Sequence, residues 1–401
     1  MHQKPVDPVD PAPLGSCIEQ YTSYLKNYQP CSWNIGEAER RSLHYFINVV
    51  ALDLSRYLPG RFWDELVPRQ CHADPMIRDA VLALSSAHMS KRATPATSLQ
   101  ATGAYQRAIT RLRAYINTNI EPSRSVVVLC CIVFYTFCHM IEDAIAALTH
   151  LQGGLSILGR QCAMNTTERD LSGMLVQLDM ETMLKQPDLT DPLQLGCWKQ
   201  EVSWNVRFHS PHEAMATSTR ILHSVWRFIT TNSCYRCCPI DAVPEGVLYE
   251  RAQLRQWMEW WRYATKGYLQ TLPALALDSE TAFSKGQLSS RQLVDGISAL
   301  VLELQHIAAK RMLSDCIFEP WDNDHWEKNP AKMLWYGEKI VVLKRMHQRI
   351  NDLPYLAHCA ATEPLMLLAQ RSRVPAIRAR ARSLADQLTQ GPKDCLYTAA
   401  A

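Results

Sequence analysis

Three cysteines stand within five residues, at Cys234, Cys237 and Cys238, a spacing that occurs in metal sites. A structural zinc site needs four ligands, which come as two such pairs or as one pair followed by two histidines. The sequence has no second pair, the next histidine is His306, and His223 precedes Cys234 by eleven residues. We therefore interpret the cluster as reduced thiols in a turn, and expect neither a metal centre nor a cofactor.

Other catalytic motifs are incomplete. His212-Glu213 begins like a metalloprotease helix but lacks its second histidine, and the chain contains no nucleophile elbow, phosphate-binding loop or dinucleotide fingerprint. No two aspartates are adjacent, so the magnesium motif of helical terpene cyclases is missing as well. Asp322 to His325 are interpreted as the cap of a helix that starts near Trp326. We expect a protein that is not an enzyme.

Tryptophans gather in the C-terminal half, where nine of the eleven lie from Trp198 onward. Two interpretations stay open. Large aromatic side chains are ordinary core residues, which is the interpretation we favour. The alternative is a pocket for an apolar effector, or for the substrate of a helical enzyme, lined by Trp257, Trp261, Trp326 and Trp335.

Five arginines fall in a window of twelve residues without an acid: Arg371, Arg373, Arg378, Arg380 and Arg382. On a helix, Arg378 and Arg382 share a face while Arg380 points away, so the charge is spread. We expect a solvated surface; a phosphate-contacting face or a short nuclear-import signal is the alternative.

The composition is that of a globular protein. The chain has 401 residues, 47% of them hydrophobic, and a net charge of +3, too small to indicate nucleic-acid binding by itself. The N-terminus has no apolar signal segment. The longest apolar run, residues 126–138, is too short to span a bilayer, so no membrane contact is expected.

The elements that would position these residues are predicted to be helices throughout. Residues 1–35 are expected to form a proline-rich disordered tail, residues 36–390 a helical domain with a looser segment at 186–212, and residues 391–401 a C-terminal tail. Apolar residues at three- and four-residue spacing predict helices. The expected helices are one beginning at Asp74-Pro75, one around 105–116, and others at 126–138, 144–158 (broken at Gly153-Gly154), 213–230, 254–264, 293–312, 333–350, 365–370 and 377–388.

One block carries a family resemblance. The segment from Phe62 to His88 resembles the fungal-specific transcription factor domain, the helical middle homology region of zinc binuclear cluster regulators. The family's F-W-x-x-L-V pattern is followed by an acid-Pro helix start and an Ala/Leu-rich helix. The matching residues are Phe62, Trp63, Leu66, Val67, Asp74, Pro75, Ile77, Arg78, Ala83, Leu84 and His88.

Later segments of the chain resemble segments of the same family domain and follow in the same order, across roughly residues 40–390. The helix from Tyr105, the apolar run around Leu129, His150 with Gly153 and Gly154, and Phe208 with Glu213 and Ala214 resemble successive family segments. The resemblance implies a large all-α regulatory domain in which these positions hold the fold together and are not catalytic.

The chain departs from the family pattern at its start. The family's DNA-reading module needs six cysteines in two C-x2-C halves, whereas only Cys17 and Cys31 stand in the first seventy residues. The resemblance therefore implies a nuclear regulator of pathway-specific genes, such as a secondary-metabolite cluster, without direct DNA binding. Its partners would be proteins, such as a full-length zinc-cluster factor, together with a small-molecule effector. The alternative is that an upstream exon encodes the six cysteines.

Overall fold

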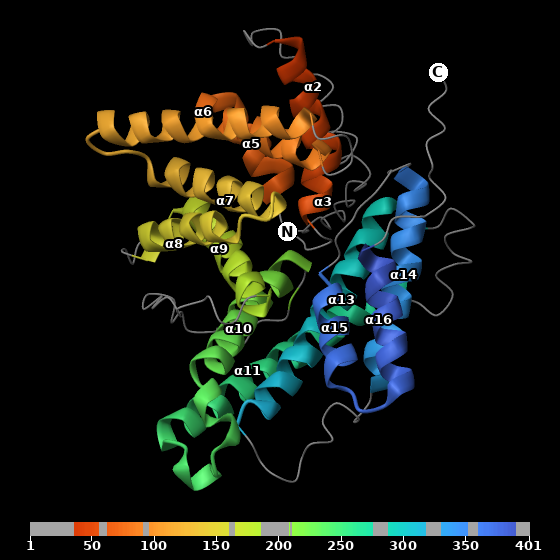
Figure 1. Cartoon of the computed structure of the whole chain (residues 1–401). Helices are drawn as coiled ribbons and strands as arrows, with labels where there is room; N and C mark the ends of the chain where they lie inside the picture. The colour runs from red at the N-terminus through yellow and green to blue at the C-terminus, as the bar shows by residue number, and fades with distance from the viewer. Residues whose placement is uncertain are drawn as a thin grey trace, which may run out of the picture. The chain divides into compact units, whose positions relative to one another are not determined.

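The computed structural model describes residues 36–55, 62–90, 96–159, 165–185, 208, 211–275, 288–317, 330–351 and 360–389. All regular elements in these ranges are helices, which confirms the all-α prediction (Figure 1). The predicted tails at 1–35 and 391–401, most of the looser segment, and Trp326 lie outside the described residues. The chain divides into two compact units, Met1–Arg41 and Ser42–Ala401, and every helix that begins after Arg41 belongs to the second.

The N-terminal part of the described chain consists of helices that follow one another closely in the sequence. They are α2 (Glu37–Tyr45), a π-helical segment (Phe46–Val50), α3 (Ala51–Ser55), a second π-helical segment (Phe62–Leu66), α4 (Val67–Ala73), α5 (Pro75–Ser90) and α6 (Ala96–Thr118). Helix α5 contacts α4, α6 and the next helix, α7 (Arg124–Met140). The predicted helix start is confirmed, because Asp74 Oδ1 accepts a hydrogen bond from the Met76 backbone N–H at 2.8 Å and Pro75 is the first helical residue.

Helices α7 and α8 (Ala144–Gly159) form a tight hairpin. The ambiguous apolar run at 126–138 is a buried helix, as expected from its length. Between the two helices, Glu142 adopts a left-handed backbone with φ of 66°, and the Asp143 N–H donates to the Cys138 carbonyl at 2.9 Å. Asp143 then caps α8 by accepting from the Ala146 N–H at 3.0 Å. Three residues thus reverse the chain.

The expected break in α8 at Gly153-Gly154 is wrong. The helix continues to Gly159, because Gly154 brings its backbone close to α7 and α9 (Thr166–Lys185). A Cβ atom on Gly154 would lie 3.1 Å from a Leu175 methyl and 3.3 Å from the Cys131 Cβ. The glycine therefore serves helix–helix packing and does not end the helix.

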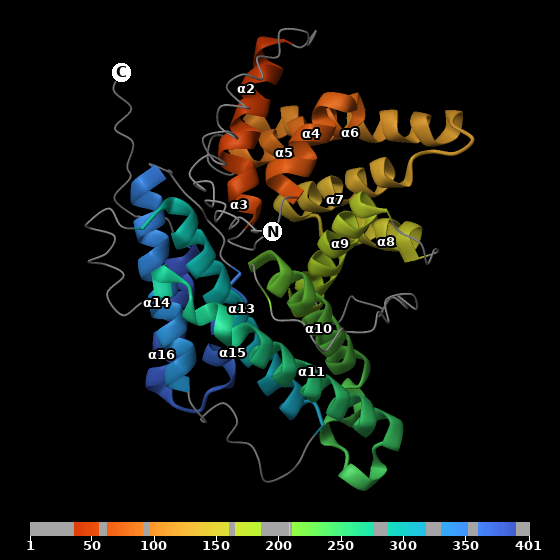
Figure 2. The same ribbon diagram turned by 180° about the vertical axis from the view of Figure 1, so that it is seen from behind.

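The C-terminal helices, which Figure 2 draws in green to blue, share one hydrophobic core with the end of α9. They are α10 (Pro211–Thr231), α11 (Glu245–Gln270), α13 (Ser290–Asp315), α14 (Pro330–Asn351), α15 (Thr362–Arg371) and α16 (Pro375–Thr389). Helix α10 starts at Pro211, two residues before the expected helix start at Glu213, since proline fits the first helical position. Helix α10 packs on α9, α11 and α13, and α13 packs on α14 and α15.

Two buried cations cap helix C-termini in this core. Arg251 of α11 donates from Nε to the Leu313 carbonyl at 3.1 Å and from Nη2 to the Ser314 carbonyl at 2.8 Å. Lys344 of α14 donates to the Leu388 carbonyl at 2.6 Å. The last carbonyls of a helix lack intrahelical partners and carry partial negative charge, so these contacts lower the cost of burying both cations.

Replacing glycine with alanine should have opposite effects on the free energy of unfolding at Gly296 and at Gly173. A Cβ on Gly296 of α13 would stand 2.6 Å from the Ala274 Cβ, whereas one on Gly173 of α9 meets nothing within 4 Å. We expect Gly296→Ala to lower the free energy of unfolding by about 1–3 kcal/mol. Gly173→Ala should raise it by about 0.5–1 kcal/mol, because alanine is the better helix former. Urea denaturation measures both, and equal effects would contradict this packing.

The left-handed turn predicts a stabilising substitution. Glu142→Gly should raise the free energy of unfolding by about 1 kcal/mol, since glycine adopts positive φ without the steric cost that a Cβ carries. Glu142→Ala is the matched control, because it removes the same side chain and keeps the Cβ. Thermal denaturation in which both variants shift equally would show that the backbone conformation is not the cause.

Candidate functional site

The residues of the Phe62–His88 block lie in the core of the N-terminal helices. Nearly all its apolar members are buried: Phe62, Trp63, Leu66, Val67, Ile77, Ala83 and Leu84. Arg78 is half-buried and Pro75 is exposed at the helix start. These positions build the packing between α4, α5 and their neighbours.

His88 closes this block with a buried polar chain. Its Nε2 lies 3.1 Å from Asp53 Oδ2 and its Nδ1 lies 2.9 Å from Tyr45 Oη. Because a carboxylate only accepts, His88 Nε2 donates to Asp53. The chain of contacts ties α2 and α3 to α5.

The later motif residues also make packing contacts. His150 lies 2.7 Å from the Tyr105 hydroxyl through Nε2, and burial lowers the pKa of its ring. Gly153 and Gly154 face Cys131, as the close packing of α8 requires. At the start of α10, Glu213 is exposed while Ala214 is buried. The Ala214 carbonyl accepts a hydrogen bond from Trp261 Nε1 at 2.9 Å.

The three tryptophans of the predicted pocket that the structure describes differ in their exposure. Trp261 is 1% exposed and its ring stacks on His306 at a centroid distance of 3.7 Å. Trp257 is half-buried on the same helix. Trp335 of α14 is 47% exposed, and Trp326 lies outside the described residues.

A recess instead opens where α9, α10, α13 and α15 meet. Its apolar wall consists of Met180, Leu222, Trp226, Ala308, Pro364 and Leu367, and its polar residues are Glu181, Gln305 and Glu363. The recess is small: the volume that a water-sized group can occupy is about 30 Å³. None of the lining residues is basic. This recess does not follow from the sequence, because its residues come from helices that are far apart along the chain.

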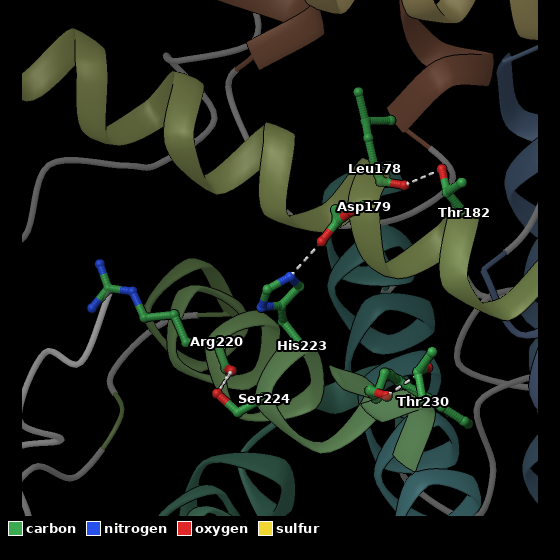
Figure 3. Close-up of polar contacts among 8 residues, drawn as sticks. Leu178, Asp179, Thr182, Arg220, His223, Ser224 and Thr230 are labelled. Carbon is green, nitrogen blue, oxygen red and sulfur yellow. Dashed lines mark hydrogen bonds and ion pairs between the residues drawn. The ribbon is translucent and has the colours of Figure 1, made fainter. Parts of the chain in front are cut away.

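Helix α10 carries buried polar contacts on two sides of the recess. Towards α9, His223 Nε2 donates to Asp179 Oδ2 at 2.7 Å, as Figure 3 shows, and both side chains are buried. Towards α13, the Ser218 hydroxyl and His306 Nε2 are 2.9 Å apart. These contacts set the position of α10 between its neighbours.

Ser218 and His306 resemble the first two members of a hydrolytic triad, but their surroundings exclude that role. Ser218 is 0% exposed, so no substrate reaches its hydroxyl. Among the residues that the structure describes, none forms a hydrogen bond with His306 Nδ1, so no carboxylate of this part orients the ring. Burial lowers the pKa of His306 to about 3, which keeps the imidazole neutral. The pair is a core contact.

The cysteines of the described chain differ by location. Cys71, Cys130, Cys131, Cys138 and Cys316 are buried, which confirms the core prediction for the apolar run, and burial raises the pKa of these thiols. Cys234 is exposed in the 3₁₀ turn Ser233–Cys237. Within the described ranges, no group of three or more His, Cys, Asp or Glu is placed to hold a metal ion. None of the described helices has the length and apolar character to cross a membrane.

The arginine window spans the turn between α15 and α16. Arg373, Arg378, Arg380 and Arg382 are exposed, as expected for a solvated surface, and Arg371 is half-buried. Arg380 forms two hydrogen bonds with Glu338 Oε1 of α14, at 3.0 Å and 2.7 Å. This contact fixes one arginine of the window to the helical core.

Comparison with known proteins returns no relative: no family model matches the chain, and no curated protein or solved structure matches it either.

The Phe62–His88 block predicts a pH dependence of stability through Asp64. Burial, together with the neighbouring Glu65, raises the pKa of its carboxyl from 3.8 to about 7. Because folding raises this pKa, the contribution of Asp64 to the free energy of unfolding is fully present below about pH 4, and it is lost as the pH rises through 7. The loss should reach at most about 4 kcal/mol, at 1.36 kcal/mol per pKa unit.

Asp64→Asn removes this titration, so we expect its free energy of unfolding to change little between pH 4 and 8 and to exceed that of the wild type at pH 8. Asp170→Asn, at an exposed position of α9, is the control. Urea titrations at several pH values check this. Parallel curves for wild type and Asp64→Asn would contradict it.

Proposed function

We propose that this chain is a nuclear transcriptional regulator that acts through its helical domain on a pathway-specific gene set, such as a secondary-metabolite cluster. The observation that carries the proposal is the Phe62–His88 block, whose sequence resembles the fungal transcription factor domain. The all-α architecture and the burial of the block's apolar residues support it, because the resemblance implies a scaffold role for these positions.

The chain acts through partners in this proposal. No six-cysteine cluster stands in the sequence, so DNA contact is supplied by a protein partner, such as a full-length zinc-cluster factor. The exposed arginines at the turn between α15 and α16 are accessible to an import receptor or an acidic partner segment. A small-molecule effector would set the activity of the complex.

The second candidate is a helical small-molecule-binding protein without a regulatory role. The composition of the recess beside Trp226 favours it, since an apolar wall with a few polar groups is a common form of binding site, although a ligand larger than a water-sized group would have to widen the recess. The two candidates differ in one observable: only the first changes transcription when the chain is brought to a promoter.

A tethering experiment tests the proposed function. The chain is fused to a foreign DNA-binding module upstream of a reporter in a fungal host, and reporter RNA is measured beside transcripts of a strain that lacks the chain. We expect the fusion to change reporter RNA and the deletion to change a defined gene set. Leu84→Asp should abolish the effect, because Leu84 is 0% exposed.

Gln106→Asp, which places the same charge on the exposed face of α6, is the matched control and should keep the activity. An unchanged reporter together with unchanged transcripts across growth conditions would contradict the proposal. Mapping the 5′ end of the transcript separates a chain that starts at Met1 from one with upstream zinc-cluster cysteines.

A further inference from the structure

The turn that follows α10 brings two accessible thiols close together. Residues Ser233–Cys237 form a 3₁₀ helix, which ends where Cys238 takes an extended backbone with φ of −88° and ψ of 145°. Cys234 is exposed, Cys238 is half-buried, and both are free thiols. The Cys238 Sγ lies 3.5 Å from the Cys234 carbonyl oxygen. The sulfur of one cysteine therefore folds back over the backbone of the other.

These two thiols differ from the buried cysteines in access. The buried cysteines of the described chain are Cys71, Cys130, Cys131, Cys138 and Cys316. Burial raises the pKa of each of them, so they stay protonated in the core. Thiols react as thiolates and only where a reagent can reach them. Within the described chain, a ligand that seeks sulfur is therefore directed to the turn.

The number of sulfurs selects the class of ligand. A structural zinc ion needs four protein ligands, and within the described ranges no group of three or more His, Cys, Asp or Glu is placed to hold a metal ion. Trivalent arsenic is soft and prefers thiolate sulfur to nitrogen or oxygen ligands. An arsenical with one organic substituent has two positions that sulfur can fill. Two thiols on one short turn therefore satisfy it without a further protein ligand.

We propose that residues 234–238 bind a trivalent organoarsenical, with the sulfurs of Cys234 and Cys238 bonded to one arsenic atom. The exposed Cys234 side chain rotates about its Cα–Cβ bond to bring its sulfur beside that of Cys238. Both S–H bonds and the arsenic–oxygen double bond break, two S–As bonds form, and the oxygen leaves as water with the two thiol protons. Arsenic stays trivalent, so no oxidant or reductant is consumed. Binding by the purified chain does not depend on the proposed function.

Phenylarsine oxide is the probe, because its arsenic carries one phenyl group and has two positions for sulfur. The full chain is reduced, freed of reductant, mixed with one equivalent of the probe and measured by intact mass spectrometry. We expect one adduct per chain, formed with loss of water. Cleavage after glutamates releases residues 214–245, which contain Cys234, Cys237 and Cys238 and no other cysteine. The adduct should be found on this peptide.

Three serine variants test the pair. Cys234→Ser and Cys238→Ser should each weaken binding about 100-fold or more, because a single thiol lacks the second bond that forms within the same molecule. Cys237→Ser is the matched control, since it removes a thiol of the same turn and should bind like the wild type. The side chain of Cys237 lies outside the part that the structure describes. Circular dichroism checks that each variant keeps its helices.

Competition with small thiols distinguishes a bridge from a single bond. The dithiol 2,3-dimercaptopropanol should remove the arsenical, whereas 2-mercaptoethanol at the same thiol concentration should leave it bound, because only the dithiol forms a competing ring. The proposal is overturned if no adduct forms on residues 214–245, if Cys238→Ser binds like the wild type, or if both small thiols remove the probe equally well.

These outcomes are separate from the tethering experiment. An adduct on the turn with an unchanged reporter would leave the thiol site and remove the regulatory role, and the reverse result would do the opposite.

Discussion

Helix α10 is fixed on three sides by buried hydrogen bonds, and the arrangement of the surrounding helices depends on them. His223 reaches Asp179 of α9 at 2.7 Å, and Ser218 reaches His306 of α13 at 2.9 Å. The Ala214 carbonyl accepts from Trp261 of α11 at 2.9 Å. Hydrophobic contact is not directional, whereas a buried polar group left without its partner costs about 1–3 kcal/mol. The three contacts therefore set the rotation and the register of α10.

The candidate site is a consequence of this constraint. Leu222 and Trp226 lie on α10 beside His223, and Met180 and Glu181 lie on α9 beside Asp179, so the histidine–aspartate contact aligns one wall of the recess. The opposite wall follows from α13, where Gln305 is adjacent to His306. The fold thus brings Glu181, Glu363 and Trp226 to one recess, although none of the three belongs to a sequence motif.

The sequence predicts the helices well because apolar periodicity and proline or aspartate starts are local signals. The helix after Asp74 and the buried run at 126–138 are examples. Local signals fail where distant contacts decide. Gly154 would break an isolated helix, but close packing against Leu175 keeps α8 continuous. The partners of His223 and Ser218 stand 44 and 88 residues away in the sequence, so these polar contacts do not follow from local residue spacing. The exposure of Trp335 likewise depends on the position of α14.

Hydrogen exchange tests the central claim that α10 joins the N-terminal and C-terminal helices into one cooperative unit. In the wild-type chain, the slowest amides of α7 and α13 should open with the same free energy. Asp179→Asn replaces the carboxylate that His223 contacts, and it should lower protection in α7 and in α13 by the same amount. Loss of protection confined to α7, α8 and α9, with α13 unchanged, would contradict the account.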